Sequence, residues 1–303
     1  MTPAEKFLNE IAKDLGTQPG YKIEEEVFFT LRYAKSRSVA VKNTEIARNE
    51  MPKYLGEADY ETSISTTSQT VRRAIVNKYK EEMTADGVDV NILLNGQVGQ
   101  GGIWRDAYNW LWQYKYPRWL EAHSWELLRE KATSPANWIQ FLTGEMADLK
   151  KSRGPYLKDE EPEPEIPQII PVNEKLWIAI DLEYPHCQFL LFNRSEAGVV
   201  LLCPSFGYAP NPIIDKPPLL LPQRDSFAEQ TKQKFRFNDK GQEEFLGIVL
   251  AKPLNLPWLI PQRQEKIPKW NNQRIKELFE QLETQNNWQV FYQSFEVVEL
   301  DNP

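Results

Sequence analysis

The chain has 303 residues, about two domains at the usual length of roughly 100–200 residues per domain. Its hydrophobic fraction of 41% and aromatic fraction of 12% are enough for folded cores, which excludes a disordered chain. The formal net charge of −7 excludes a uniformly basic nucleic-acid binder. Lys and Arg balance Asp and Glu in residues 1–153, so the negative excess falls in residues 154–303.

The first residues, MTPAEKFLNE, lack the basic start and apolar run of a secretory signal. No stretch approaches the roughly 18 continuous apolar residues that a membrane span needs. Cys187 and Cys203 are the only cysteines, which is typical of a reduced compartment. We therefore expect a cytoplasmic protein that does not bind a membrane.

The N-terminal part has the pattern of a helical domain. Thr2, Pro3 and Glu5 form a helix start with a capping box, and Gly16 can end that helix. Apolar spacing predicts further helices over residues 23–31, 44–51 and from Thr67 or Ser68 to Lys80. Alternating Val88, Val90 and Ile92 predict a short strand.

Residues 103–131 are dense in aromatic side chains, with Pro117 interrupting any single long helix. We interpret the aromatic residues as core packing, rather than as a platform for bases or a partner. Ser134-Pro135 would start another helix, with Trp138, Ile139 and Leu142 on one face. The glycine-rich GQVGQGG at 96–102 lacks the Lys-Ser/Thr of a phosphate-binding loop, so we expect a flexible turn.

A proline-rich, acidic segment predicts a linker over residues 154–173, between a helical domain (1–153) and a β-rich domain (174–303). Beyond it the apolar period falls to two, which indicates strands. One late helix is expected, because Ile275, Leu278, Phe279 and Leu282 follow helical spacing. The predicted fold class is α+β, with a mostly antiparallel, β-sandwich-like C-terminal domain. The strands are expected at 176–182, 188–193, 198–203, 234–237, 245–251 and 288–300.

Catalytic chemistry has little support in the sequence. His123 and His186 are the only histidines, and only His186 with Cys203 leaves a nucleophile–base pair open. Asp181 and Glu183 share a strand face, and a cluster of carboxylates lies at 159–165. On an acidic protein we interpret both groups as solvated charges. We predict no catalytic residue, no cofactor and no metal site.

A basic helix is the best functional candidate from the sequence. NTEIARNEM and STTSQTVRRAIVNKY resemble the two helices of a helix-turn-helix, although about fifteen residues separate them and three or four are usual. A winged-helix variant with an inserted loop would accommodate this, with residues 88–94 in the wing. A helical bundle with a solvated basic face is the alternative. The predicted DNA contacts are Ser68, Gln69, Arg72 and Arg73 at base edges and Lys78 and Lys80 at phosphates.

Two stretches of the C-terminal half carry a resemblance. They are KLWIAIDLEYPHCQFLLFNRSEAGVVLLCPS and RDSFAEQTKQKFRFNDKGQEEFLGIVLAKPLNLP. Over about residues 174–260 the chain resembles a bacterial domain family of unknown function, which is common C-terminal to caspase-like peptidases and kinases. The resemblance implies a sandwich-like accessory module in a signalling or defence system, and it transfers no functional residue.

Two functions follow as hypotheses. The first is a regulator whose N-terminal domain binds duplex DNA and whose β domain binds a protein partner or a signal. The second is an adaptor that binds only proteins. An enzyme is a distant third alternative.

Overall fold

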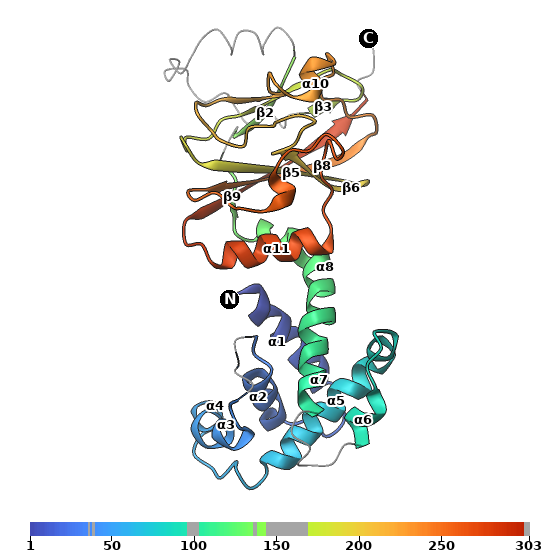
Figure 1. Cartoon of the computed structure of the whole chain (residues 1–303), viewed down its shortest axis with the longest axis vertical. Coiled ribbons are helices and arrows are strands. Elements are labelled where there is room, and N and C mark those ends of the chain that lie inside the picture. The colour runs from blue at the N-terminus through green and yellow to red at the C-terminus, as the bar shows by residue number, and fades with distance from the viewer. Residues whose placement is uncertain (36, 38–39, 96–102, 136–137, 144–168, 300–303) are drawn as a thin grey trace. The chain divides into compact units, whose positions relative to one another are not determined.

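The computed structural model describes the chain except residues 36, 38–39, 96–102, 136–137, 144–168 and 300–303. The fold class is α+β, as predicted (Figure 1). The chain divides into two compact units, Met1–Ala122 and His123–Pro303. This division lies ahead of the predicted linker, because residues 132–142 contribute strands to the C-terminal sheets. Most of the linker lies outside the described residues, and its last part forms a short strand.

The N-terminal unit is helical. Its elements are α1 (Pro3–Gly16), α2 (Ile23–Arg32), α3 (Asn43–Asn49), α4 (Pro52–Leu55), α5 (Ile64–Ala85), α6 (Val90–Asn95), α7 (Ile103–Trp110), the π-helix η1 (Leu111–Lys115) and the first turns of α8 (Tyr116–Arg129). The predicted start of α1 is confirmed: Thr2 Oγ1 accepts from the Glu5 amide at 3.2 Å, and Glu5 accepts from the Thr2 amide at 2.7 Å. The long helix α5 contacts α1, α2, α3, α6 and α7, so it organises this unit.

The predicted strand at Val88–Ile92 is wrong, since these residues enter helix α6. The Asp89 carboxylate accepts hydrogen bonds from the amides of Asn91 and Ile92, at 3.0 and 3.2 Å, as a helix N-cap does. Val90 and Leu93, three residues apart, are the buried positions. The winged-helix interpretation therefore lacks its wing strand.

The aromatic segment forms three consecutive helices, α7, η1 and α8. Pro117 has no amide hydrogen for the turn before it, and this turn is π-helical, a common result of a disturbed α-helical ladder. Phe7 lies against the rings of Trp112, Tyr116 and Trp119 at centroid distances of 5.5, 5.2 and 5.6 Å. These aromatic residues pack in the core, as predicted.

The C-terminal unit contains two sheets. Its strands are β1 (Ala132–Thr133), β2 (Ile139–Leu142), β3 (Ile169–Pro171), β4 (Trp177–Ile180), β5 (Gln188–Ser195), β6 (Gly198–Cys203), β7 (Leu219–Leu221), β8 (Gly241–Leu250) and β9 (Trp288–Val298). Within the described residues, the larger sheet has the order β1-β9-β8-β5-β6 with β3 also paired to β9, and the smaller sheet is β2-β4-β7. Strands β1 and β3 run parallel to β9, and the other pairs are antiparallel.

The two sheets face each other across one aromatic core, so the sandwich-like prediction is confirmed. Phe141 of β2 lies 5.4 Å from the ring of Phe245 in β8 and 4.9 Å from that of Phe295 in β9. Gly247 of β8 leaves room in this core for two other rings, because a Cβ there would lie 2.9 Å from Phe189 and 3.0 Å from Trp138.

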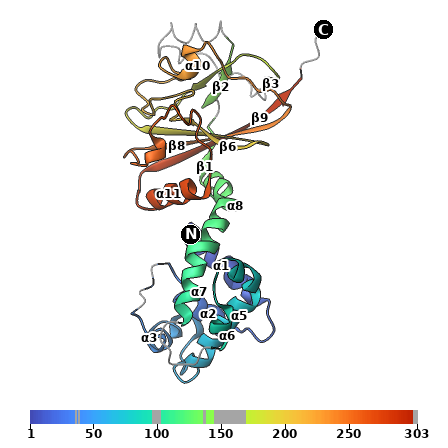
Figure 2. The ribbon, with the colours of Figure 1, turned by 45° about the vertical axis from the view of Figure 1, so that its right-hand side comes forward.

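The other face of the larger sheet carries the late helix α11 (Asn272–Glu283), with all four predicted apolar residues buried (Figures 1 and 2). Short helices α10 (Phe227–Gln230) and η2 (Pro257–Leu259) lie in the connections. On β8, Glu244 accepts from Tyr292 Oη at 2.5 Å and pairs with Arg194 Nε at 3.0 Å. Arg194 also pairs with Glu126 at 3.3 Å, which ties the last turns of α8 to this face.

Two expectations for this unit are wrong. The helix expected after Ser134-Pro135 is replaced by β2, because Ile139 and Leu142 pair with β4 and Trp138, just ahead of the strand, is buried in the sandwich core. The strand expected at 234–237 makes only an isolated bridge, between Leu176 and Phe235. Among the described helices of both units, none has the length and apolarity to cross a membrane.

Candidate functional site

The predicted DNA contacts lie on different sides of α5. Arg73, Lys78 and Lys80 are exposed, and Gln69 is half-buried. Ser68 accepts a hydrogen bond from the Asn43 side chain at 3.1 Å, which joins α5 to α3. Arg72 is only 7% exposed, and burial lowers its pKa. The helix therefore offers three of the six predicted residues freely to a ligand.

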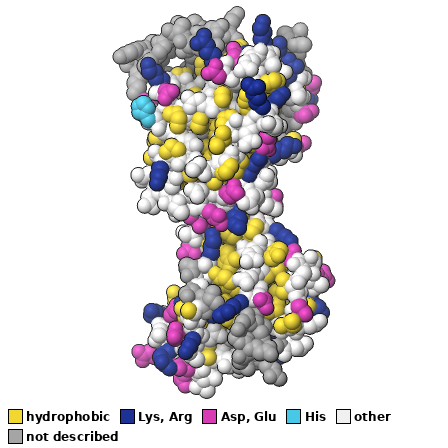
Figure 3. Space-filling view, viewed as in Figure 1, with side chains coloured by type: hydrophobic (Ala, Val, Ile, Leu, Met, Phe, Trp, Pro, Cys, Tyr) yellow, Lys and Arg dark blue, Asp and Glu magenta, His cyan; other side chains and the backbone are white. Residues whose placement is uncertain are grey.

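The surface gives no continuous basic field in the view of Figure 3, where Lys and Arg side chains are interspersed with Asp and Glu. The helices expected to form a helix-turn-helix, α3 and α5, are separated by α4 and by residues 56–63. DNA binding stays a prediction that rests on the exposed residues of α5.

The residues considered for catalysis do not form a site. Cys203 is fully buried, its Sγ lies 3.6 Å from the Phe189 carbonyl oxygen, and burial raises the pKa of the thiol. His186 is exposed on the surface, so it cannot serve this thiol as a base for a substrate. Asp181 and Glu183 lie beyond the end of β4 and are exposed.

The glycine-rich segment 96–102 and the carboxylates at 159–165 lie outside the described residues. Over the described part of the chain, no group of three or more His, Cys, Asp or Glu side chains is placed to hold a metal ion.

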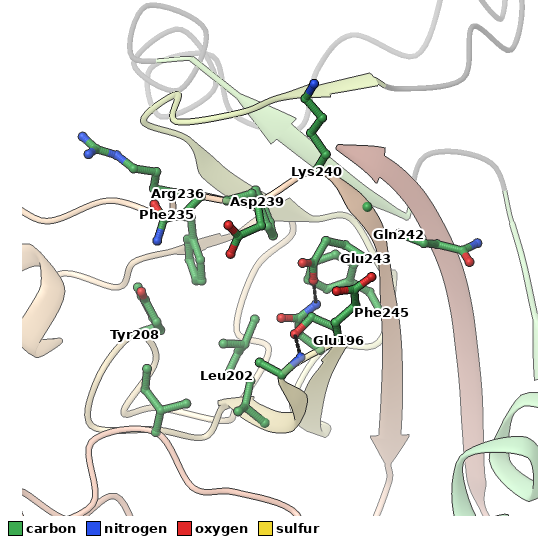
Figure 4. A pocket seen from close by; sticks show the side chains of 18 residues that line it. Glu196, Leu202, Tyr208, Phe235, Arg236, Asp239, Lys240, Gln242, Glu243 and Phe245 are labelled. Atoms are coloured by element: carbon green, nitrogen blue, oxygen red, sulfur yellow. Dashed lines mark hydrogen bonds between the residues drawn. The ribbon is translucent and has the colours of Figure 1, made fainter. Parts of the chain in front are cut away.

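A pocket of about 290 Å³, here called the sandwich pocket, lies in the C-terminal unit beside β5, β6 and β8 (Figure 4). Tyr208 and Phe235 stack on one side of it, with ring centroids 3.9 Å apart. Its apolar lining consists of Val200, Leu202, Tyr208, Phe235, Phe237, Phe245 and Ile267. The pocket therefore offers aromatic faces and aliphatic groups to a ligand.

The strand register explains why these side chains converge. Successive residues of a strand point to opposite faces, so alternate positions line one wall. Glu243 and Phe245 on β8 are such a pair, as are Val200 and Leu202 on β6. Asn193 of β5 lies opposite Phe245 in the register. The wall is thus built from inward positions of three neighbouring strands.

Glu243 is the central polar residue of the sandwich pocket. Asn193 Nδ2 donates to Glu243 Oε2 at 2.7 Å. Burial raises the pKa of Glu243, and the hydrogen bond from Asn193 opposes this increase only in part. The ionised carboxylate is therefore under-solvated, and a cation entering the pocket would stabilise it.

The charged lining contains more acidic than basic residues. Glu196, Asp239 and Glu243 supply carboxylates, and Arg236 and Lys240 are the basic residues of the lining. Lys240 pairs with Glu299 at 2.6 Å. Figure 4 shows the Asp239 carboxylate turned toward the pocket, whereas the Arg236 and Lys240 side chains extend away from it. Carboxylates beside aromatic faces are a favourable environment for an organic cation.

Sequence reasoning missed the sandwich pocket. The signal for it is polar residues on the core-facing side of strand ends, at Asn193 and Glu243. That signal becomes readable only when the strand register is known.

Comparison of the chain with protein-family models, with curated proteins and with solved structures finds no match. The candidate site is therefore argued from the geometry of this chain alone. The family resemblance noted for residues 174–260 stays a prediction.

Proposed function

We propose that this protein is a non-enzymatic adaptor whose C-terminal sandwich binds a positively charged side chain of a protein partner. The observation that carries the proposal is the sandwich pocket, in which the half-buried Glu243 lies with Glu196 and Asp239 beside aromatic walls. A bound cation would supply the counter-charge that Glu243 lacks.

The size of the pocket favours a side chain over a cofactor. Its volume of about 290 Å³ is at the lower limit of the range for small-molecule sites, which runs from roughly 300 to 1,000 Å³. Lysine and arginine side chains combine an apolar stem with a charged head. The stem would lie against Leu202 and Phe235, and the head would reach Asp239 and Glu243.

The resemblance of the C-terminal half to an accessory domain family supports the same role, in a bacterial signalling or defence system of the cytoplasm. The alternative is a regulator whose N-terminal unit binds duplex DNA. We prefer the adaptor, because Arg72 is buried and Ser68 is bonded to Asn43, which leaves Arg73, Lys78 and Lys80 as accessible contacts.

The adaptor proposal is tested by calorimetric titration of the full chain with blocked amino acids. N-acetyl-lysine methylamide and N-acetyl-arginine methylamide are the probes, and the norleucine analogue is the neutral control of similar shape. We expect the cations to bind at least about tenfold tighter than norleucine, equivalent to about 1.4 kcal/mol. Equal affinity for norleucine, or no cation binding at millimolar concentrations, would refute the proposal.

Substitutions localise the site in the same assay. Glu243→Gln and Asp239→Asn should each weaken cation binding, and Asp215→Asn, an exposed carboxylate outside the pocket, should not. Because binding needs the ionised form of Glu243, affinity should rise with pH through its raised pKa and then level off. The Glu243→Gln variant should lose this part of the pH dependence.

A further inference from the structure

A second hollow lies in the N-terminal unit and is independent of the sandwich pocket. It has a volume of about 290 Å³ and is formed by the turn after α5, by α6, by α7 and by the π-helix η1. We call it the acidic groove; its lining is Gly87, Val88, Asp89, Ile92, Asp106, Asn109, Trp110, Gln113 and Tyr114.

The acidic groove gathers exposed apolar groups. Ile92 is 55% exposed and Tyr114 is 41% exposed, although both are large hydrophobic side chains. Only seven large hydrophobic side chains are exposed in the described part of the chain, and two of them line this one groove. Exposed apolar groups gathered in one place, with polar neighbours, are typical of interaction sites.

The floor of the groove is held in place. Trp110 is 1% exposed, and its Nε1 donates to Asp86 Oδ2 at 2.8 Å. Arg118 donates to both oxygens of the same carboxylate, at 2.9 and 2.5 Å. Asp89 fixes the start of α6 through the Ile92 amide. A ligand would therefore meet a site that is already formed, which reduces the entropy lost on binding.

The charged residues of the lining are both acidic. They are Asp89 and Asp106, and the lining contains no Lys or Arg. Two cations on the adjoining η1 and α8 already have partners, since Arg118 pairs with Asp86 and Lys115 pairs with Glu82 at 2.8 Å. The groove is thus complementary in charge to a basic partner.

The helix geometry adds a further reason to regard this face as functional. Gln113 and Tyr114 belong to the π-helical turn η1. Single π-helical turns within α-helices frequently lie at functional sites. Here the turn supplies the exposed ring of Tyr114 to the lining of the groove, and α6 supplies Ile92.

We propose that the acidic groove docks a short basic, amphipathic segment of a protein partner. An apolar side chain of that segment would lie between Ile92 and Tyr114, and its Lys or Arg residues would pair with Asp89 and Asp106. The inference extends the adaptor role to the N-terminal unit and does not depend on the sandwich pocket.

Peptide selection on the full chain tests this proposal. A library of random twelve-residue peptides is selected for binding to the wild-type chain, and peptides that also bind an Ile92→Ser variant are removed. We expect the surviving peptides to combine an aromatic or aliphatic anchor with flanking Lys or Arg. Survivors without a basic bias, or no survivors at all, would overturn the proposal.

The affinities of the selected peptides are then measured by fluorescence polarisation. Ile92→Ser should weaken binding about tenfold or more, and Ile23→Ser, an equally exposed isoleucine outside the groove, should have no effect. Asp89→Asn keeps a residue that caps a helix but removes the charge, so it should weaken binding up to about fivefold, as should Asp106→Asn. Glu57→Gln is the matched control for charge.

Three further measurements keep the outcome decisive. Thermal melts confirm that each variant is folded, and Glu243→Gln should leave peptide binding unchanged, which separates this inference from the proposed function of the sandwich pocket. Sedimentation of the wild-type chain tests whether a second copy of the chain occupies the acidic groove instead. A dimer that Ile92→Ser abolishes would overturn the proposal in favour of self-association.

Discussion

Glu243 should make the protein less stable at neutral pH than it would be with a neutral residue at that position. Burial raises the pKa of Glu243 in the folded chain, so the folded state binds more protons than the unfolded state between the unfolded and folded pKa values. Stability contributed by the protonated carboxyl is therefore present below the unfolded pKa and lost as the pH rises through the folded pKa. Glu243→Gln removes this pH dependence.

The magnitude follows from the contacts of the side chain. A glutamine can keep the 2.7 Å hydrogen bond from Asn193, because its amide oxygen can accept as the carboxylate oxygen does. What the substitution removes is the desolvation penalty of a half-buried charge, so we expect a gain of about 1 kcal/mol at pH 7. For a unit of this size the Tm should rise by about 2–4 °C.

Thermal melts of the full chain between pH 4 and 8 measure this effect. The Tm of Glu243→Gln should exceed that of the wild type by a difference that increases as the pH rises. Glu296→Gln, which changes an exposed residue on β9, is the control. A lower Tm for Glu243→Gln at pH 7, or a difference independent of pH, would refute the reasoning. The same variant should bind cations more weakly, so stability and binding would change in opposite directions, as is common at functional sites.

Three further predictions concern buried residues. Gly247→Ala should destabilise the C-terminal unit by about 1–3 kcal/mol in denaturant melts, because the added methyl group would lie 2.9 Å from Phe189. Cys203 should resist iodoacetamide until the chain unfolds, because the thiol is buried and its pKa is raised, and mass spectrometry of labelled peptides would detect early labelling. Arg72→Ala should lower the Tm of the N-terminal unit, whereas Lys78→Ala should leave it within about 0.5 kcal/mol of the wild type.

The sequence predicts those elements whose signals are local. Helix α1 is one of them, because Thr2 and Glu5 cap it through contacts three residues apart. Helix α11 is another, since its four apolar residues follow a single helical face. The sequence also predicts strands β5, β6, β8 and β9 near their observed positions, because each has several apolar or alternating residues.

The errors occur where distant residues decide the conformation. Trp138, Ile139 and Leu142 fit one face of a helix, but pairing of β2 with β4 places Ile139 and Leu142 in a strand that begins just after Trp138. Such short apolar segments are ambiguous between helix and strand by periodicity alone. The sandwich pocket could not be predicted for the same reason. Asn193 and Glu243 are 50 residues apart in the sequence and meet only through the register of β5 and β8.

The two candidate sites share one physical character, which bears on the choice of partner. Each presents carboxylates beside aromatic or aliphatic groups, and each belongs to a different compact unit. A net charge of −7 adds a long-range field that attracts basic proteins and repels nucleic acid. The association rate constant of a basic partner should therefore be higher at low salt than at about 0.15 M salt, where the electrostatic screening length is about 8 Å.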